Sequence, residues 1–263
     1  MTILDKIIAD KKREVQLKKQ LIPVAQLENS VLFGARTQSL GKNLRNNRVG
    51  IIAEHKRRSP SKSIINTTFS VEEVVIGYQN AGASGISVLT DGKYFGGSLD
   101  DLVLAKASAN IPLLRKEFIV DEYQILEAKA FGADAILLIS TVLSRQEIKQ
   151  LSEFAHSLDL EVLLEVHNRE ELEKAIMPSL DMVGVNNRSL KTFEVSLDTS
   201  KILASYIPDE FVKVSESGIS SIGAIVELQQ FGYQGFLIGE HFMKTENPGE
   251  AASKFVNFLI PKP

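Results

Sequence analysis

The run Ile51-Ile52-Ala53-Glu54-His55-Lys56 starts with three apolar residues and ends with charged ones. Five later runs also end in a charged or amide-bearing residue, at 112–116, 162–165, 182–186, 212–216 and 236–240. A charge inside a buried strand costs free energy, whereas a charge at its solvated end does not. We therefore expect the runs to be buried strands whose polar ends gather on one face, as in an active site.

Strand-like runs and helical patterns alternate along the chain. Strands are expected at 50–56, 86–90, 112–116, 134–139, 161–166, 182–186, 211–215 and 235–239, with helices between them, for example at 71–81, 123–131, 144–157, 170–176 and 222–230. This alternation indicates βα units and a parallel sheet. The strand count favours a closed barrel over an open sheet, and the glycine motifs of dinucleotide and P-loop sites are absent. We predict an α/β fold, a single (βα)8 TIM barrel.

The N-terminal residues, 1–48, are predicted to form a helical extension, and residues 49–263 the barrel that carries the catalytic site. Within residues 1–20, apolar side chains recur at helical spacing and indicate an amphipathic helix. These side chains are Ile3, Leu4, Ile7, Ile8 and Val15. The polar face mixes both charges, so docking on the barrel is favoured over binding to a membrane surface.

The composition limits the partners of the protein. A net charge of −3 argues against a surface that coats nucleic acid, and no apolar run approaches the ~20 residues of a membrane span. The absence of cysteine excludes disulfides, thiolate catalysis and cysteine-ligated metals. The N-terminus has neither a secretory nor a transit pattern. We expect a cytoplasmic protein without nucleic-acid or membrane partners, either a monomer or a homodimer.

Strand parity divides the polar residues at the strand ends into two sets. Active sites of such barrels lie at the C-terminal ends of the strands, where successive side chains point to opposite faces. Parity sends His55, Arg115 and Glu117 outward. The set predicted to face inward is Glu54, Lys56, Lys116, Glu165 and Asn186. Carboxylates and ammonium groups in one pocket shift one another's pKa values and can serve as acids and bases; the alternative is a set of ion pairs that ties the barrel rim together.

Small residues after the last two strands indicate a phosphate site. Ser217 and Gly218 follow one strand and Gly239 follows the other. In these barrels such loops bind phosphate through backbone N–H groups; the alternative is that the glycines only serve turns. The basic loop at 56–62, stiffened by Pro60, is interpreted as an active-site loop rather than a nucleic-acid or phosphorylation site. The four histidines lack metal-binding spacing, so no metal is predicted.

The runs quoted above carry a family resemblance. The segments 52–61, 88–91, 114–118, 132–139, 164–167, 186–188 and 215–219 resemble indole-3-glycerol phosphate synthase, in the family's order and over nearly the whole chain. The resemblance implies closure of the indole ring of 1-(2-carboxyphenylamino)-1-deoxyribulose 5-phosphate, with release of carbon dioxide and water and without a cofactor. It implies a phosphorylated small-molecule substrate and a place in tryptophan biosynthesis.

The resemblance also implies roles for individual residues. Lys116 is similar to the general acid that activates the substrate carbonyl, and Glu165 to the base of the later dehydration. Lys56 would engage the substrate carboxylate or act as a second acid, and Glu54 would orient the lysines. The remaining expected substrate contacts are Asn186, Arg188, Glu216, Phe118 and Ser59, and the expected phosphate contacts are Ser217, Gly218, Gly239 and Glu240.

The sequence departs from the family pattern at His55, Ser63 and Glu117, which puts the local loop geometry in question. Parity keeps His55 out of the barrel mouth. Two alternatives to the synthase are a phosphosugar aldolase or isomerase, in which Lys116 forms a Schiff base, and a barrel that binds a phosphorylated ligand without turnover.

Overall fold

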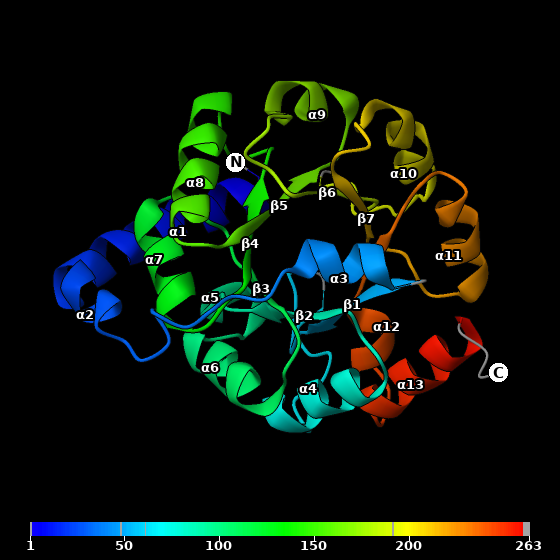
Figure 1. The fold of residues 1–263 in the computed structure, drawn as a ribbon, viewed down its shortest axis with the longest axis horizontal. Helices are drawn as coiled ribbons and strands as arrows, with labels where there is room; N and C mark the ends of the chain where they lie inside the picture. Colours follow the sequence, from blue (N-terminus) through cyan, green and yellow to red (C-terminus); the bar gives the residue numbers. More distant parts are fainter. Residues whose placement is uncertain (1, 48, 61, 191, 260–263) are drawn as a thin grey trace.

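The computed structural model describes residues 2–47, 49–60, 62–190 and 192–259. Ser61 of the predicted basic loop and the predicted domain limits at 1, 48 and 263 lie outside these ranges. Figure 1 shows a closed parallel barrel in which strands pair in chain order and the last strand pairs with the first. The strands are β1 (Gly50–His55), β2 (Gly85–Leu89), β3 (Leu113–Lys116), β4 (Ala135–Ile139), β5 (Glu161–Val166), β6 (Met182–Asn186), β7 (Val212–Glu216) and β8 (Gly235–Ile238). The predicted TIM barrel is confirmed.

Helices surround the barrel in Figure 1. They are α4 (Val71–Asn80), α6 (Leu99–Ser108), α7 (Glu122–Ala130), α8 (Arg145–Ser157), α9 (Arg169–Ala175), α10 (Asp198–Leu203) with the 3-10 turn η1 (Ala204–Tyr206), α11 (Ile222–Gln229) and α13 (Pro248–Leu259), while the short α5 (Gly92–Phe95) and α12 (Glu240–Met243) follow β2 and β8. Helices α4, α6, α7, α8, α9 and α11 each begin after a serine, aspartate or asparagine whose side chain accepts a backbone N–H. Such caps satisfy amide groups that have no partner within the helix, so the helix starts are encoded locally.

The barrel interior is an apolar layer closed at one end by α3 (Leu40–Asn46). Leu40 and Leu44 of α3 pack with strand residues such as Ile52. A Cβ atom on Gly85 would lie 2.4 Å from the Leu40 side chain, so the absence of a side chain at Gly85 leaves room for Leu40 of α3. Helix α3 therefore seals the N-terminal end of the strands and leaves only the other end open.

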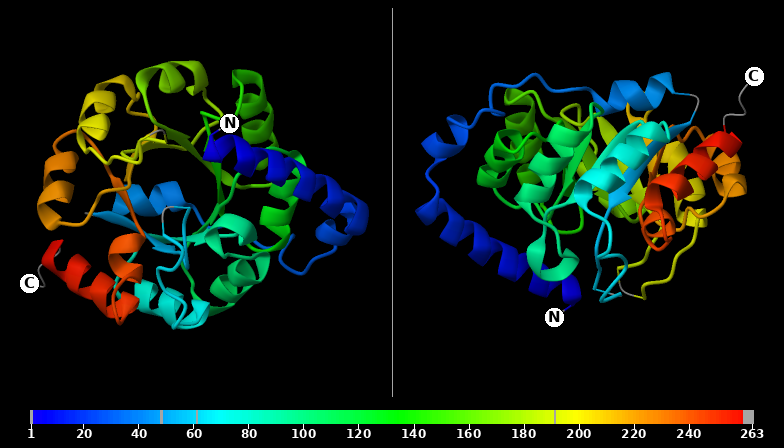
Figure 2. Two further views of the ribbon diagram at one scale, coloured as in Figure 1. Left: turned by 180° about the vertical axis from the view of Figure 1, so that it is seen from behind. Right: turned by 90° about the horizontal axis from the view of Figure 1, so that it is seen from below.

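Two further helices, α1 (Ile3–Leu21) and α2 (Val24–Glu28), extend beyond the barrel wall. Val15 and Leu27 pack with Tyr123, Leu126 and Ala130 of α7, which confirms that the amphipathic helix docks on the barrel. Figure 2 shows α1 and α3 on opposite ends of the barrel, with the N-terminal part of α1 beside the open end. Among the described residues, no helix combines the length and apolar character needed to cross a bilayer.

Candidate active site

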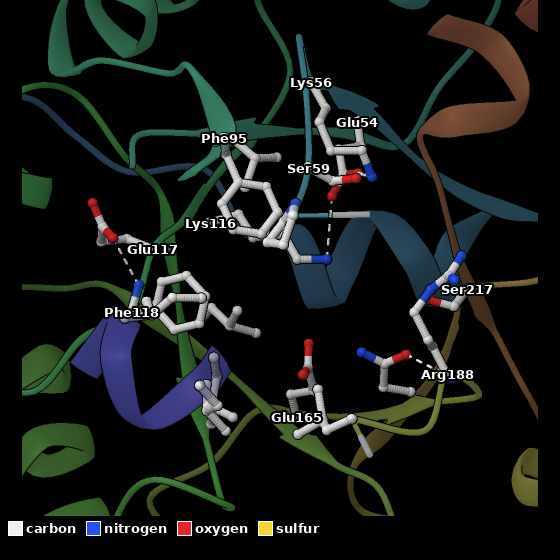
Figure 3. A pocket seen from close by; sticks show the side chains of 18 of the residues that line it. Glu54, Lys56, Ser59, Phe95, Lys116, Glu117, Phe118, Glu165, Arg188 and Ser217 are labelled. Atoms are coloured by element: carbon white, nitrogen blue, oxygen red, sulfur yellow. Dashed lines mark hydrogen bonds and ion pairs between the residues drawn. The ribbon is translucent and has the colours of Figure 1, made fainter. Parts of the chain in front are cut away.

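A chain of ion pairs lies at the open end of the barrel (Figure 3). The Lys116 ammonium lies 3.2 Å from Glu54 Oε2 and 3.0 Å from Glu216 Oε2. The second oxygen of Glu54 lies 2.6 Å from the Lys56 ammonium. Glu54 thus joins two lysines, and Lys116 of β3 joins two carboxylates that come from β1 and β7, the two strands on either side of β8.

Strand parity places these side chains inside the barrel. Ile52, Leu114 and Leu163 belong to the interior apolar layer. Two positions further along the same strands, Glu54, Lys116 and Glu165 line the cavity above that layer. Because alternate side chains of a strand share a face, the inward orientation follows from the register of the apolar residues below.

The buried carboxylates of Glu54 and Glu216 each lie against a glycine, where a larger residue would overlap with them. A Cβ on Gly239, just after β8, would lie 2.3 Å from Glu54 Oε1. A Cβ on Gly184 of β6 would lie 2.3 Å from Glu216 Oε1. Real Cβ atoms do not approach oxygen this closely, because packed interiors exclude overlap. Gly239 therefore has a steric reason for its place in addition to the predicted contact with phosphate.

The two carboxyl groups that contact Lys116, those of Glu54 and Glu216, have different pKa values. Burial alone would raise the pKa of Glu54, but the nearby Lys116 and Lys56 ammonium groups lower it to about 2. Burial raises the pKa of Glu216 to about 7, with Glu165 and Glu54 adding to the rise and Lys116 opposing it. Burial lowers the pKa of Lys116, but Glu216, Glu54 and Glu165 outweigh it, and the net shift is upward. In the folded protein Glu54 is thus an anion and Lys116 a cation, while Glu216 exchanges a proton near neutral pH.

Glu216 makes a contact that its position in the sequence did not predict. Its role as a substrate contact stays a prediction; in the structure its carboxylate contacts Lys116, and its Oε1 atom has no hydrogen-bond partner among the described residues. Glu216 follows Val214 of the interior apolar layer by two positions, so parity turns Glu216 inward. Only the closure of the barrel reveals that it shares the Lys116 ammonium with Glu54.

The opposite side of the cavity carries Glu165, Asn186 and Arg188. Figure 3 shows Glu165 across the cavity from Lys116, and Arg188 near Ser217. The Asn186 side chain accepts the Arg188 backbone N–H at 3.0 Å. The structure therefore gathers all five residues that were predicted to face inward, and it adds Arg188 to the same wall.

An apolar wall completes the cavity, whose volume is about 190 Å³. Phe118 and Phe95 pack with ring centroids 5.9 Å apart. Ile3, Leu4 and Ile7 of α1 line the cavity as well. Their spacing indicated a docked helix but gave no sign that the helix faces the site, because this depends on where α1 crosses the barrel end.

A second cavity adjoins the first and contains the predicted phosphate residues Ser217, Gly218, Gly239 and Glu240. It shares Glu54, Lys56, Lys116 and Arg188 with the first cavity, and Lys244 lies on its wall. Both Ser217 and Gly218 have left-handed backbone angles, with φ of 66° and 76°. This conformation is unusual for serine, so the turn is held by its surroundings.

The loop between β1 and α4 is anchored by its arginines rather than open. Arg57 binds both oxygens of Asp101, and Arg58 donates to the backbone oxygens of Gly92 and Lys93. Lys62 pairs with the Glu240 carboxylate, which ties the loop to the end of β8. Ser59 and Pro60 line the cavity, as expected for an active-site loop, but the two arginines bind residues of α5 and α6.

The departures from the family pattern have different structural surroundings. His55 lies outside the barrel interior and is buried; burial and Arg57 lower its pKa to about 4, so it is neutral near pH 7. Ser63 is exposed in the loop. Glu117 accepts a hydrogen bond from Thr90 at 3.0 Å and pairs with Lys11 of α1 at 3.1 Å.

Lys11 is a residue that sequence reasoning missed. It is only 2% exposed, and its ammonium lies 2.8 Å from Glu14, 3.1 Å from Asp91 and 3.1 Å from Glu117. Burial lowers its pKa, but Glu117 and Asp91 outweigh that effect and raise it overall. Lys11 thus attaches α1 to the loops after β2 and β3, next to the cavity. Its spacing did carry a signal, because Lys11 lies four residues from both Ile7 and Val15 and so falls on the apolar stripe of the helix.

A metal site does not emerge from the described ranges, in which no three histidine, cysteine, aspartate or glutamate side chains are placed to share an ion. The chemistry available at the cavity is that of ammonium and carboxyl groups beside an aromatic wall.

Comparison with known proteins assigns a family to this geometry. The family model for indole-3-glycerol phosphate synthase matches residues 4–255. A protein of this name from Bacteroides thetaiotaomicron is 48% identical over 98% of both chains. Another from Aliarcobacter butzleri is 42% identical over 98% of this chain and 99% of its own. A third, from Campylobacter fetus subsp. fetus, is 41% identical over 93% and 95% of the two chains.

Solved structures with low sequence identity share the barrel. Thiamine phosphate pyrophosphorylase from Pyrococcus furiosus has a TM-score of 0.60 at 16% identity and covers 84% of this chain and 100% of its own. N-(5'-phosphoribosyl)anthranilate isomerase from the same organism has a TM-score of 0.58 at 14% identity, with 81% and 98% coverage. At such identities these likenesses concern the fold alone.

Proposed function

Because the chain belongs to the indole-3-glycerol phosphate synthase family, we propose that Lys116 and Glu165 are the acid and the base of its ring-closing reaction. The family match and the named relatives assign the activity, a carboxy-lyase step of tryptophan biosynthesis on a phosphorylated small molecule. The proposal concerns which residues at the open end of the barrel donate and accept protons in this reaction.

The substrate has three parts that correspond to features of the two cavities. Its phosphate would bind between Ser217, Gly218 and the start of α12, with Arg188 and Lys244 near it. Its aromatic ring would lie against Phe118 and Phe95. The reacting ketone would then lie between Lys116 and Glu165, which face each other across the cavity. Fixing both ends of the substrate supplies the orientation that the attack of a ring carbon requires.

Ring closure begins when the ring carbon that bears the carboxylate bonds to the ketone carbon. Negative charge builds on the ketone oxygen, and Lys116 donates a proton to it. Glu216 and Glu54 keep Lys116 protonated. An alkoxide is a stronger base than an amine, so the transfer is favourable even from this stabilised ammonium. The carboxylate then leaves as carbon dioxide, and its bonding electrons return to the ring.

Dehydration completes the indole. The new hydroxyl leaves as water after it accepts a proton, and Glu165 removes the proton from the adjacent carbon. The balance is one substrate in its carboxylate form and one proton to indole-3-glycerol phosphate, carbon dioxide and water, because two protons are donated and one is removed. Lys56, 2.6 Å from Glu54, is placed to bind the substrate carboxylate or to supply the second proton.

The observation that carries these roles is the Lys116 ammonium held between Glu54 and Glu216. It also argues against the aldolase alternative. A lysine that forms a Schiff base must attack as a neutral amine, which requires a lowered pKa, whereas the pKa of Lys116 is raised. Borohydride should therefore trap no substrate adduct.

The direct test mixes the purified protein with the carboxyphenylamino substrate without metal or cofactor. Indole fluorescence and one equivalent of carbon dioxide are expected between about pH 6 and pH 9. No fluorescence across that range would refute the assignment.

We also propose that the enzyme works in the cytoplasm on a freely diffusing substrate, without nucleic acid or a membrane surface, as a monomer or a homodimer; its net charge of −3 and its small cavity are consistent with this.

A further inference from the structure

His167 lies beside the cavity but is not part of its wall. It follows Glu165 by two positions at the end of β5, and its side chain is 9% exposed. The Nε2 atom of the ring lies 3.4 Å from Glu165 Oε1. The Nδ1 atom lies 3.2 Å from Glu171 Oε2 and 3.2 Å from the Thr141 hydroxyl. The ring thus stands between two carboxylates.

Glu171, in the first turn of α9, is a fixed anion. It accepts the backbone N–H of His167 at 2.9 Å, the Thr141 hydroxyl at 3.0 Å and the Asn168 side-chain amide at 3.0 Å. Burial would raise the pKa of Glu171, but His167 and these donors lower it. A carboxylate only accepts hydrogen bonds, so the network assigns a proton to His167 Nδ1.

With Nδ1 protonated, Nε2 faces Glu165. This nitrogen is buried and has no hydrogen-bond partner among the described residues. An unprotonated Nε2 would set a lone pair against the Glu165 carboxylate, whereas a protonated one makes an imidazolium–carboxylate pair. The charged groups that act on the ring are Glu165, Glu171 and Glu216; burial lowers the pKa of His167, and these carboxylates outweigh it.

We propose that His167 is a positioning residue for Glu165: Glu171 and Thr141 hold the ring through Nδ1, and Nε2 orients the Glu165 carboxylate and balances its charge. The inference rests on the proposed role of Glu165 as the base. His167 acts through Glu165, since the cavity wall contains Glu165 but not the histidine. Among the described residues that line the cavity, four are glutamates (Glu54, Glu117, Glu165 and Glu240) and three are basic (Lys56, Lys116 and Arg188), so a cation beside Glu165 offsets part of the negative charge.

Two substitutions of His167 distinguish its role in orienting Glu165 from its role in balancing the charge of Glu165. His167→Asn keeps an amide near the Nδ1 position for Glu171 and loses the contact with Glu165. His167→Gln keeps a neutral donor near the Nε2 position. We expect His167→Asn to lower kcat about ten- to a hundred-fold, the usual effect of removing a supporting contact, with KM changed less than about two-fold because substrate contacts remain.

The pH profile supplies a readout that a merely structural role would not move. A carboxylate that loses a neighbouring cation is protonated more easily. The acidic limb of the kcat profile should therefore shift to higher pH in His167→Gln, even if kcat at its maximum is largely kept. An acidic limb at the wild-type position in both variants would overturn the proposal.

A double substitution shows whether the effect passes through Glu165. If it does, Glu165→Gln with His167→Asn should be no slower than Glu165→Gln alone. Multiplied losses would mean that His167 acts elsewhere and would overturn the proposal. His156→Asn is the matched control, since His156 also pairs with a carboxylate, Asp181 at 2.8 Å, but on the far end of α8 from the site. It should leave kcat and the pH profile unchanged.

A measurement without turnover completes the test. The chain has four histidines, so the His167 ring can be assigned by its loss in His167→Gln and titrated by NMR. Its pKa should fall when Glu165 is replaced by glutamine; no change would overturn the proposed pair. A wild-type enzyme without indole formation would instead refute the proposed function, and an active Glu165→Gln would refute only the role of Glu165.

Discussion

The Lys116 ammonium and the Glu216 carboxylate lie 3.0 Å apart, although 100 residues separate them in the chain. They come from β3 and β7, on opposite sides of a barrel that is apolar below them. Both groups are largely buried, so removal of one partner would leave the other charge without compensation.

Replacement of the proposed acid and base should abolish turnover without abolishing binding. We expect Lys116→Ala and Glu165→Gln each to lower kcat by about a hundred- to ten-thousand-fold, with affinity for a phosphorylated substrate analogue little changed. Calorimetric binding and steady-state fluorescence measure the two effects. Equal losses of affinity and turnover would show that these residues only bind.

Matched controls lie outside the site. Lys106 pairs with Asp134 on the outer face and is as buried as Lys116, with side chains 16% and 17% exposed. Glu161 begins β5, the strand that carries Glu165, and accepts the Gly41 N–H at 2.8 Å near the barrel end that α3 closes. Lys106→Ala and Glu161→Gln should lower stability but keep kcat.

Glu216 should make stability depend on pH. Its folded pKa of about 7 lies above its ordinary value of 4.5, so the folded protein holds a proton that the unfolded chain releases. Its contribution is complete below about pH 4.5 and is lost as pH rises through about 7. Glu216→Gln should remove this decline, which denaturant unfolding at several pH values can measure. If the free energy of unfolding of the variant and of the wild type depended on pH in the same way, the assignment would be contradicted.

Lys11 should couple stability to substrate affinity. Lys11→Met leaves Asp91 and Glu117 buried without their cation, so we expect a loss of about 3–5 kcal/mol in the free energy of unfolding. We also expect a raised KM, because Ile3, Leu4 and Ile7 of the same helix line the cavity. Lys12→Met is the control, since Lys12 is exposed. An unchanged KM in a folded Lys11→Met protein would exclude α1 from substrate binding.

Gly239→Ala should displace Glu54. The added Cβ would lie 2.3 Å from Glu54 Oε1 and 2.9 Å from its Cβ, so we expect a loss of about 1–3 kcal/mol in stability and a fall in kcat. Gly223→Ala in α11, whose nearest neighbour would be 4.0 Å away, should keep kcat and gain a little stability. Wild-type kcat in Gly239→Ala would show that Glu54 needs no fixed position.

The sequence by itself determined the barrel and the inward residues. The apolar runs, their alternation with helices and the two-residue period of a strand are local properties, so they predicted which of Glu54, His55 and Lys56 would face the cavity. The tertiary structure decided which inward residues meet. Barrel closure and the path of α1 across the open end decide three contacts: Lys116 with Glu54 and Glu216, Lys11 of α1 with Asp91 and Glu117, and His167 with Glu165. Spacing along the chain cannot encode these contacts, because the partners are set by packing between distant segments and the charges are held only where that packing excludes water.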